Sequence, residues 1–166
     1  GGGTSAVQRG AATGARVTAS VRNPDMHAAV QALGASQVVL PEDFVAAGPY
    51  DVVLELIGAP NMPRNLEALA LDGRIVVIGV GAGASAEVNL MQLMGKRGRI
   101  LASTLRARPL EGKAVAAAAV ERHVVPLLAA GRVTVPVEAV FALDEAAAAY
   151  ERFAAGAKLG KIVITP

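Results

Sequence analysis

Apolar runs rich in β-branched residues alternate along the chain with alanine-rich stretches in which apolar residues recur at helical spacing. The apolar runs predict strands at 16–21, 37–40, 51–57, 74–80, 99–103, 133–141 and 161–164. The intervening stretches predict helices at 5–12, 26–33, 61–71, 86–94, 111–130 and 143–155. Asn23 and Pro24 are expected to start the second helix, and Pro126 is expected to kink or restart the long one.

The strands expected at 51–57 and 74–80 are nearly continuous apolar runs rather than alternating ones. Such strands are buried on both faces, which is typical of a parallel sheet covered by helices. Short turns marked by glycine separate strand from helix. The pattern therefore predicts an α/β domain with a doubly wound parallel sheet of the Rossmann, dinucleotide-binding type.

The composition narrows the class of protein. The 166 residues are 53% hydrophobic and 18% charged, with a net charge of +2 and no cysteine. The lack of cysteine excludes a disulfide framework, a thiol nucleophile and a cysteine-ligated zinc site within these residues. Scattered basic residues make no nucleic-acid footprint, and no stretch is apolar and long enough for a membrane span. We expect a soluble, cytoplasmic protein without nucleic-acid or membrane partners.

The sequence opens with Gly1-Gly2-Gly3-Thr4, directly before the first expected helix. Glycines let a backbone approach phosphates, and the first N–H groups of a helix face an anion, so the pattern favours a pyrophosphate site. The strand that precedes such a turn is not in the sequence. A flexible leader or a cloning remnant is therefore the alternative interpretation.

The strand expected at 16–21 ends near Ser20 and Arg22, with no acid before Asp25. In a dinucleotide fold this strand ends beside the adenosine ribose, where an Asp or Glu binds the hydroxyls of NAD. A hydroxyl and a guanidinium suit a 2′-phosphate, which an acid would repel. The two residues therefore favour NADPH, and a solvated arginine in a turn is the alternative.

Eight segments follow one another in an order that resembles a known superfamily: GGGTSAVQ, GARVTAS, QALGASQVV, DVVLELIG, GRIVVIGVGAG, NLMQLMGKRGRILAST, LRARP and LGKIVITP. Together they resemble the cofactor domain and C-terminal return of the medium-chain dehydrogenase/reductase superfamily. The most similar branch is that of the zinc-independent quinone oxidoreductases. The resemblance covers essentially the whole chain and implies an NADPH-dependent enzyme that transfers hydride from nicotinamide to a quinone or another activated alkene.

The resemblance also implies which residues contact the cofactor. They are Gly1, Gly2, Gly3 and Thr4 in the phosphate loop, Ser20 and Arg22 at the 2′-phosphate, Ile57 and Gly58 below the nicotinamide-side ribose, Ile78, Gly79 and Val80 near the nicotinamide, and Ser103 and Thr104 in the loop at the far end of the cleft. The branch often has a lysine near Met26 and an aromatic residue near Pro41. Both are absent here, which leaves Arg22 as the main candidate cation.

Two parts are expected from the resemblance. Residues 1–130 would form the dinucleotide-binding domain, and residues 131–166 a return segment that would complete a catalytic domain. In the family a β-barrel catalytic domain and the first strand of the cofactor sheet precede the position of Gly1. The chain is therefore expected to be a fragment, or the traced remainder of a longer polypeptide, and its sheet is expected to have a gap where that strand belongs.

The strand at 99–103 is expected to form an outer edge of the sheet. It is short and apolar, and exposed edges of this kind pair readily with other chains. The resembling family commonly forms dimers by joining two such edges, which would place Ile100 and Ala102 opposite their symmetry mates. A homodimer through 99–103 is expected, and the alternative is that the loop at 104–109 covers this edge.

Other residues with chemical potential are assigned structural roles. His27 and His123 have no partner at metal-ligand spacing, and Glu55 is expected to be a hydrogen-bonded structural residue beside the cofactor ribose. The basic residues at 96, 97, 99, 106 and 108 are interpreted as a solvated rim. No catalytic residue and no metal ligand are identified. A zinc-dependent alcohol dehydrogenase of the same superfamily and a non-catalytic NADPH-binding or structural protein are the alternative functions.

Overall fold

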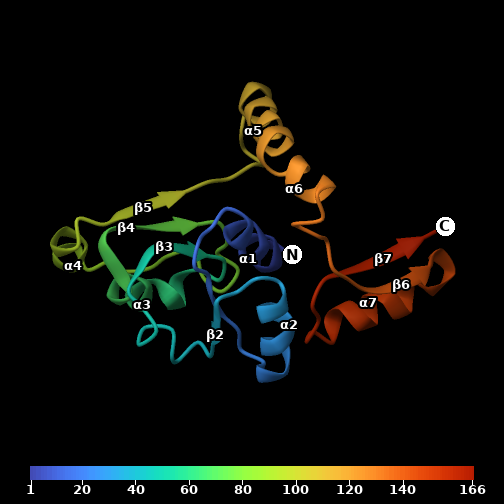
Figure 1. Cartoon of the computed structure of the whole chain (residues 1–166), viewed down its shortest axis with the longest axis horizontal. Helices are drawn as coiled ribbons and strands as arrows, with labels where there is room; N and C mark the ends of the chain where they lie inside the picture. The colour runs from blue at the N-terminus through green and yellow to red at the C-terminus, as the bar shows by residue number, and fades with distance from the viewer. The chain divides into compact units, whose positions relative to one another are not determined.

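The computed structural model describes all 166 residues, which form two compact units (Figure 1). The first unit comprises Gly1–Leu40 and Ala118–Pro166, and the second comprises Pro41–Ala117. The strands form three separate parallel sheets, β1-β2, β3-β4-β5 and β6-β7. Parallel strands joined through helices confirm the expected α/β class.

The N-terminal part of the first unit packs two helices against a short sheet. Its elements are α1 (Gly2–Ala12), β1 (Thr18–Ser20), η1 (Pro24–Met26), α2 (His27–Ala32) and β2 (Gln37–Val39). Val7 of α1, Val30 of α2 and Ala35 are buried together, with Val17 and Val38 packed against them. The Oδ1 atom of Asn23 accepts a hydrogen bond from the backbone N–H of Asp25 (3.1 Å), which confirms the predicted helix cap.

The C-terminal part of the first unit contains a strand–helix–strand motif. It is built from β6 (Val137–Ala142), η3 (Leu143–Glu145), α7 (Ala146–Ala154) and β7 (Lys161–Thr165), and the two strands pair in parallel. Before it come α5 (Leu110–His123), which crosses the boundary between the units at Ala117, and α6 (Val125–Ala129). Because Pro126 stands in the first turn of α6, the predicted restart of the long helix is confirmed.

The second unit is a three-stranded sheet with one covered face. Its elements are β3 (Tyr50–Glu55), η2 (Ala59–Asn61), α3 (Met62–Glu67), β4 (Leu69–Val77), α4 (Leu90–Gly95) and β5 (Arg99–Ala102). Leu66, Leu69 and Ile75 are at most 1% exposed and form the core, with Val53 and Ile100 packed against it. Val53, Ile75 and Ile100 are register partners across the three strands, so their side chains share the covered face.

Several boundaries differ from the sequence prediction. The helix expected at 86–94 begins only at Leu90, and the strand expected at 74–80 spans Leu69–Val77. The helix expected at 61–71 ends at Glu67, because Leu69 pairs with Tyr50 and joins β4. Lys96 Nζ donates to the carbonyls of Glu67 (2.6 Å) and Leu69, and so satisfies groups that a longer helix would have bonded. The strand expected from residue 133 begins only at Val137, and the first helix begins at Gly2 rather than at residue 5.

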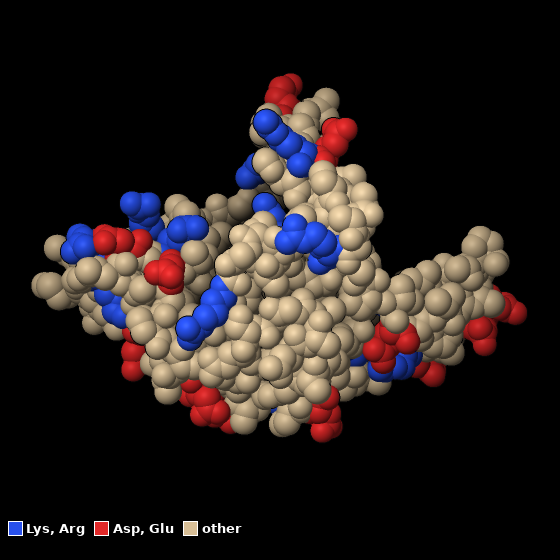
Figure 2. Space-filling model, viewed as in Figure 1, with Lys and Arg blue, Asp and Glu red and all other residues tan.

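The strand β5 lies at an edge of its three-stranded sheet, as predicted. None of the helices is long and apolar enough to cross a membrane. On the face shown in Figure 2, lysine and arginine are dispersed among aspartate and glutamate, unlike the basic stripe of a typical nucleic-acid interface.

Candidate cofactor site

Glu55 ends β3 with a side chain that is only 2% exposed. Its Oε1 atom accepts hydrogen bonds from the backbone N–H groups of Ile57 (2.5 Å) and Gly58 (2.7 Å) and from Asn61 Nδ2 (3.4 Å). Its Oε2 atom accepts from Asn65 Nδ2 (2.5 Å). Glu55 therefore has the structural role that was expected: its carboxyl group links the end of β3 to the following turn and to α3.

The segments predicted to contact the nicotinamide end lie side by side at the carboxyl ends of β3 and β4. The Glu55 carbonyl accepts from the N–H groups of Ile78 (2.9 Å) and Gly79 (3.2 Å), and the Ile57 carbonyl accepts from Ala82 N–H (2.9 Å). Side chains of Ile57, Ile78 and Val80 are about half exposed there. In an open α/β sheet, ligands bind outside the carboxyl ends of the strands, so these residues stand at the expected edge.

Two glycines allow these segments to approach so closely. A Cβ atom at Gly79 would lie 2.4 Å from the Leu56 carbonyl oxygen. Gly58 has a φ of +118°, and a Cβ atom there would lie 2.5 Å from the carbonyl oxygen of Gly83. Both positions exclude a larger side chain, because the nearest atoms belong to the backbone.

Ser103 and Thr104 follow β5 and are held by an arginine that was expected to be solvated. Arg108 donates from Nη2 to Ser103 Oγ (2.9 Å) and from Nε to the Thr104 carbonyl (3.1 Å). Arg97 forms a two-point ion pair with Asp72 (2.7 and 2.8 Å) in which both side chains stay about 60% exposed, so Arg97, like Arg108, lies on the solvated rim that was expected. This pairing lowers the pKa of Asp72, chiefly through the hydrogen bond from Arg97. Only the partners of these arginines, Asp72, Ser103 and Thr104, were not predicted from the sequence.

In the first unit, the glycines at the start of the chain border a cavity of about 280 Å³. Gly2, Gly3 and Thr4 form the first turn of α1 instead of a loop before it, since the helix begins at Gly2. The cavity is lined by Gly1, Gly2, Thr4, Ser5, Thr134, Val135, Pro136, Gly160 and Lys161. Lys161 is the only residue of this lining with a charged side chain. Lys161 thus brings positive charge to the helix N-terminus, which sequence reasoning did not find.

The cavity wall depends on a contact between distant parts of the chain. Gln8 on α1 is 4% exposed, and its Oε1 atom accepts from Thr134 N–H (2.7 Å). Its Nε2 atom donates to the Thr134 carbonyl (3.0 Å). This pairing holds the segment before β6 against α1 and explains why β6 begins only at Val137.

Ser20 and Arg22 lie together at the carboxyl end of β1, as predicted. Both are exposed, and neither side chain forms a hydrogen bond or an ion pair. The turn that carries them is nevertheless fixed, because Val21 N–H donates to the Val39 carbonyl (2.9 Å) and the Val21 carbonyl contacts His27 Nε2 (3.0 Å). His27 is therefore a half-buried structural residue of this turn. His123 is exposed.

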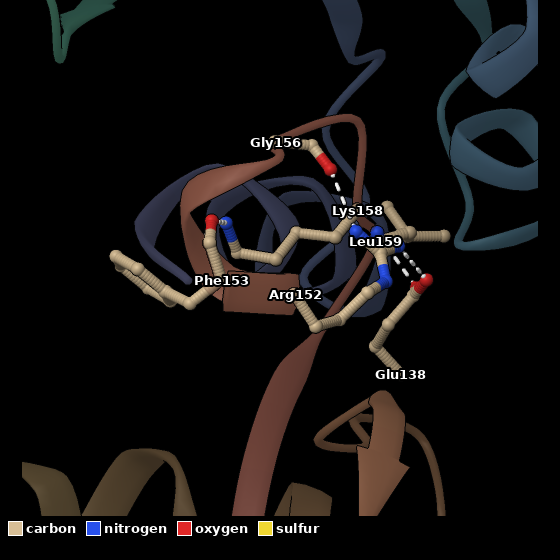
Figure 3. A network of polar contacts seen from close by, with 6 residues as sticks. All are labelled: Glu138, Arg152, Phe153, Gly156, Lys158 and Leu159. Carbon is tan, nitrogen blue, oxygen red and sulfur yellow. Dashed lines mark hydrogen bonds and ion pairs between the residues drawn. The ribbon is translucent and has the colours of Figure 1, made fainter. Parts of the chain in front are cut away.

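A polar network closes the C-terminal strand–helix–strand motif (Figure 3). Glu138 on β6 pairs with Arg152 Nη2 and accepts the Leu159 N–H at Oε2 (3.1 Å), while Arg152 Nη1 donates to the Gly156 carbonyl (2.9 Å). The hydrogen bond from Arg152 and then that from Leu159 lower the pKa of Glu138. The network fixes the turn between α7 and β7 that leads to Lys161.

Comparison with known proteins identifies dehydrogenases as relatives of this chain. The sequence profile of a family described as zinc-binding dehydrogenases matches residues 33–164. A protein of Sinorhizobium meliloti 1021 assigned as an alcohol dehydrogenase is 27% identical over 100% of this chain and 45% of its own, with a TM-score of 0.82. A thermostable alcohol dehydrogenase of Pyrobaculum aerophilum is 28% identical over 99% and 46%, with a TM-score of 0.77. No curated protein matches the chain.

A quinone oxidoreductase of Pseudomonas syringae pv. Tomato DC3000 is also similar. It is 26% identical over 99% of this chain and 53% of its own, with a TM-score of 0.76. The chain thus spans about half the length of the solved structures that it matches.

The matching family is named for zinc, but the residues of this chain do not fit a zinc ion. The chain has no cysteine, and no three His, Asp or Glu side chains lie close enough together to share a metal. We therefore assign no residue of the chain to a metal. The family profile covers most of the chain, and the folds agree along its whole length. The chain belongs to the zinc-binding dehydrogenase family, within the medium-chain dehydrogenase/reductase superfamily of oxidoreductases.

Proposed function

We propose that the chain is the cofactor-binding part of an NADPH-dependent oxidoreductase that reduces quinones or other activated alkenes. The choice of NADPH rests on the residues at the carboxyl end of β1. Arg22 is exposed and unpaired there beside Ser20, and no acid occurs before Asp25. A free guanidinium offers two parallel N–H donors to a phosphate, whereas a ribose hydroxyl of NADH has no charge to meet it.

The first turn of α1 and Lys161 are proposed to hold the cofactor diphosphate. The free N–H groups of Gly2, Gly3 and Thr4 form the positive end of a helix dipole, and the cavity beside them has Lys161 in its wall. An anion placed there would meet N–H donors and a lysine ammonium group without an acidic side chain among the lining residues. The cavity thus fits the group that the resemblance assigns to it.

The second unit is proposed to hold the nicotinamide end. Ile57, Ile78 and Val80 supply half-exposed apolar side chains, and Gly58 and Gly79 let the turns that carry them approach each other. Ser103 and Thr104 supply polar groups in the loop after β5. The cofactor, when bound, supplies the hydride, and these residues orient the ring and exclude water from it.

The quinone or enone substrate is proposed from the quinone oxidoreductase among the relatives, whose identity is close to that of the alcohol dehydrogenases. A homodimer through β5 is proposed from its place at the sheet edge. The division at residue 130, with 131–166 as a return segment, and the cytoplasmic location are kept as parts of the same proposal. A non-catalytic cofactor-binding protein is the competing function, and assay of a quinone substrate with the longer protein separates the two.

The experiment that tests the proposal compares Arg22→Ala with Arg16→Ala by calorimetric titration. Arg16 is likewise exposed and without a partner, which makes it a matched control for the loss of one positive charge. Arg22→Ala should weaken NADPH binding about ten- to a hundredfold and leave NADH binding nearly unchanged, because one charge-assisted contact is lost. Equal weakening of both cofactors by Arg22→Ala would show that Arg22 does not bind the 2′-phosphate.

A further inference from the structure

Six hydrogen bonds converge on Glu55, and they come from three separate segments. The carboxyl group accepts from Ile57, Gly58, Asn61 and Asn65, and the backbone carbonyl of the same residue accepts from Ile78 and Gly79. Glu55 therefore touches both turns assigned to the nicotinamide end and also α3.

Every contact at the carboxyl group is a donor. Two are backbone N–H groups, whose polarity is fixed, and two are side-chain amide groups. A carboxylate accepts at both oxygens, so it satisfies this arrangement completely. A glutamine of the same shape would place its NH2 group against the two backbone N–H groups, where donor faces donor, or against Asn65, whose amide would then have to turn its oxygen inward, so the arrangement seen with glutamate is lost either way.

We propose that Glu55 is the positioning residue of the nicotinamide end, which locks the turns at 57–58 and 78–79 into one preformed surface. The carboxylate fixes the first turn directly. It fixes the second through the Glu55 backbone, since Ile78 and Gly79 donate to the carbonyl of the residue whose side chain is anchored. The inference rests on the proposed function for the identity of the ligand, but the coupling of the two turns is a property of the chain alone.

Asn65 makes a rescue experiment available. In Glu55→Gln, one oxygen acceptor is replaced by a donor that faces Asn65. In Asn65→Asp alone, two carboxyl groups face each other at 2.5 Å. In the double variant, the amide NH2 introduced at position 55 would donate to the carboxylate introduced at position 65. The amide oxygen at position 55 would accept from Ile57 and Gly58, so each donor would again face an acceptor. Leu66→Ala serves as the control, because Leu66 is a core residue of the same helix without a polar contact to Glu55.

The first readout is amide hydrogen exchange without ligand, relative to the Ile75 amide in the same core. Glu55→Gln should speed exchange at Ile57, Gly58, Ile78 and Gly79 by about tenfold or more, and the double variant should reverse most of this change. Faster exchange at Ile57 and Gly58 alone would overturn the coupling of the two turns. The same pattern in Leu66→Ala at equal global stability would also overturn it, because general loosening would then suffice.

The second readout is NADPH binding by the folded protein. Glu55→Gln should weaken it about tenfold, the double variant should recover it, and Leu66→Ala should leave it unchanged once the unfolded fraction is counted. Unchanged binding in Glu55→Gln would overturn the positioning role. If the wild-type chain binds neither NADPH nor NADH, the proposed function is wrong, and the exchange measurements still decide whether Glu55 couples the turns.

Discussion

Gln8 and Thr134 exchange hydrogen bonds across 126 positions of sequence, with the Gln8 side-chain amide meeting both backbone groups of Thr134. This contact fixes the residues before β6 against α1 and so builds one wall of the cavity that Lys161 borders. A glutamine amide matches one backbone N–H and one carbonyl, as a neighbouring strand would. The site proposed for the cofactor diphosphate therefore depends on a buried side chain that never touches the cavity itself.

Replacing Gln8 should destabilise the first unit. Gln8→Ala leaves the N–H and carbonyl groups of Thr134 without partners, at a cost of about 1–3 kcal/mol. Urea denaturation measures this loss, and Gln31→Ala on the exposed face of α2 is the control, with an expected change within about 0.5 kcal/mol. Equal stability of the two variants would show that the Gln8–Thr134 contact contributes nothing.

Gly58 should tolerate no side chain. Gly58→Ala forces a residue with a Cβ atom into a φ of +118° and toward the Gly83 carbonyl oxygen, so a loss of at least about 1–3 kcal/mol is expected. Gly81→Ala is the matched control in the neighbouring loop, because nothing lies within 4 Å of its added Cβ atom. Thermal unfolding compares the two, and similar melting temperatures would contradict the close approach of the turns.

Glu138 should make stability depend on pH in the acid range. Its pKa in the folded protein is lowered from the ordinary 4.5 by Arg152 and Leu159, so its contribution is complete above about pH 4.5 and is lost as pH falls through the lowered value. The stability difference between wild type and Glu138→Gln should therefore be constant at higher pH and shrink below about 4.5. Glu151→Gln, which alters an exposed glutamate of α7, should show no such change. A difference that grows on acidification would contradict the Arg152 pairing.

The edge of β5 should mediate dimerisation. Ser103 N–H points to Val77 of β4 (3.4 Å), so alternation along the strand turns the Ala102 N–H toward the open edge. Ala102→Pro removes that donor and should shift the protein toward monomer in light scattering, whereas Ala102→Val keeps the donor and should leave the dimer intact. A wild-type protein that is monomeric at tens of micromolar would show that this edge does not pair.

Elements with a local signal could be predicted from the sequence, and elements that depend on distant contacts could not. Asn23 and Pro24 predict the start of a helix, and Pro126 predicts a restart. The apolar runs of β3 and β4 predict a parallel sheet, but the burial of both faces expected from them is wrong, since Val52 and Leu54 are more than 40% exposed. By contrast, α3 ends at Glu67 because Leu69 pairs with Tyr50 in β4, and Lys96, 27 positions beyond Leu69, then bonds the Glu67 and Leu69 carbonyls. Nothing in the residues around 61–71 reveals this partner.

The candidate site divides in the same way. Ser20 and Arg22 could be found because a dinucleotide fold places them at a known distance from the glycine-rich turn. Gly58 and Gly79 could be found by resemblance, but the reason for them, the contact of their backbones with Gly83 and Leu56, required the structure. Lys161 could not be found, because the helix N-terminus that it faces lies at the other end of the chain.

The most direct test of the account is the affinity of the full-length protein for NADPH and for NADH, measured by calorimetric titration under identical conditions. The account predicts that NADPH binds about ten- to a hundredfold more tightly, because only its 2′-phosphate meets the free guanidinium of Arg22 beside Ser20. Equal affinities, or tighter binding of NADH, would contradict the assignment of this corner and with it the proposed NADPH-dependent reductase.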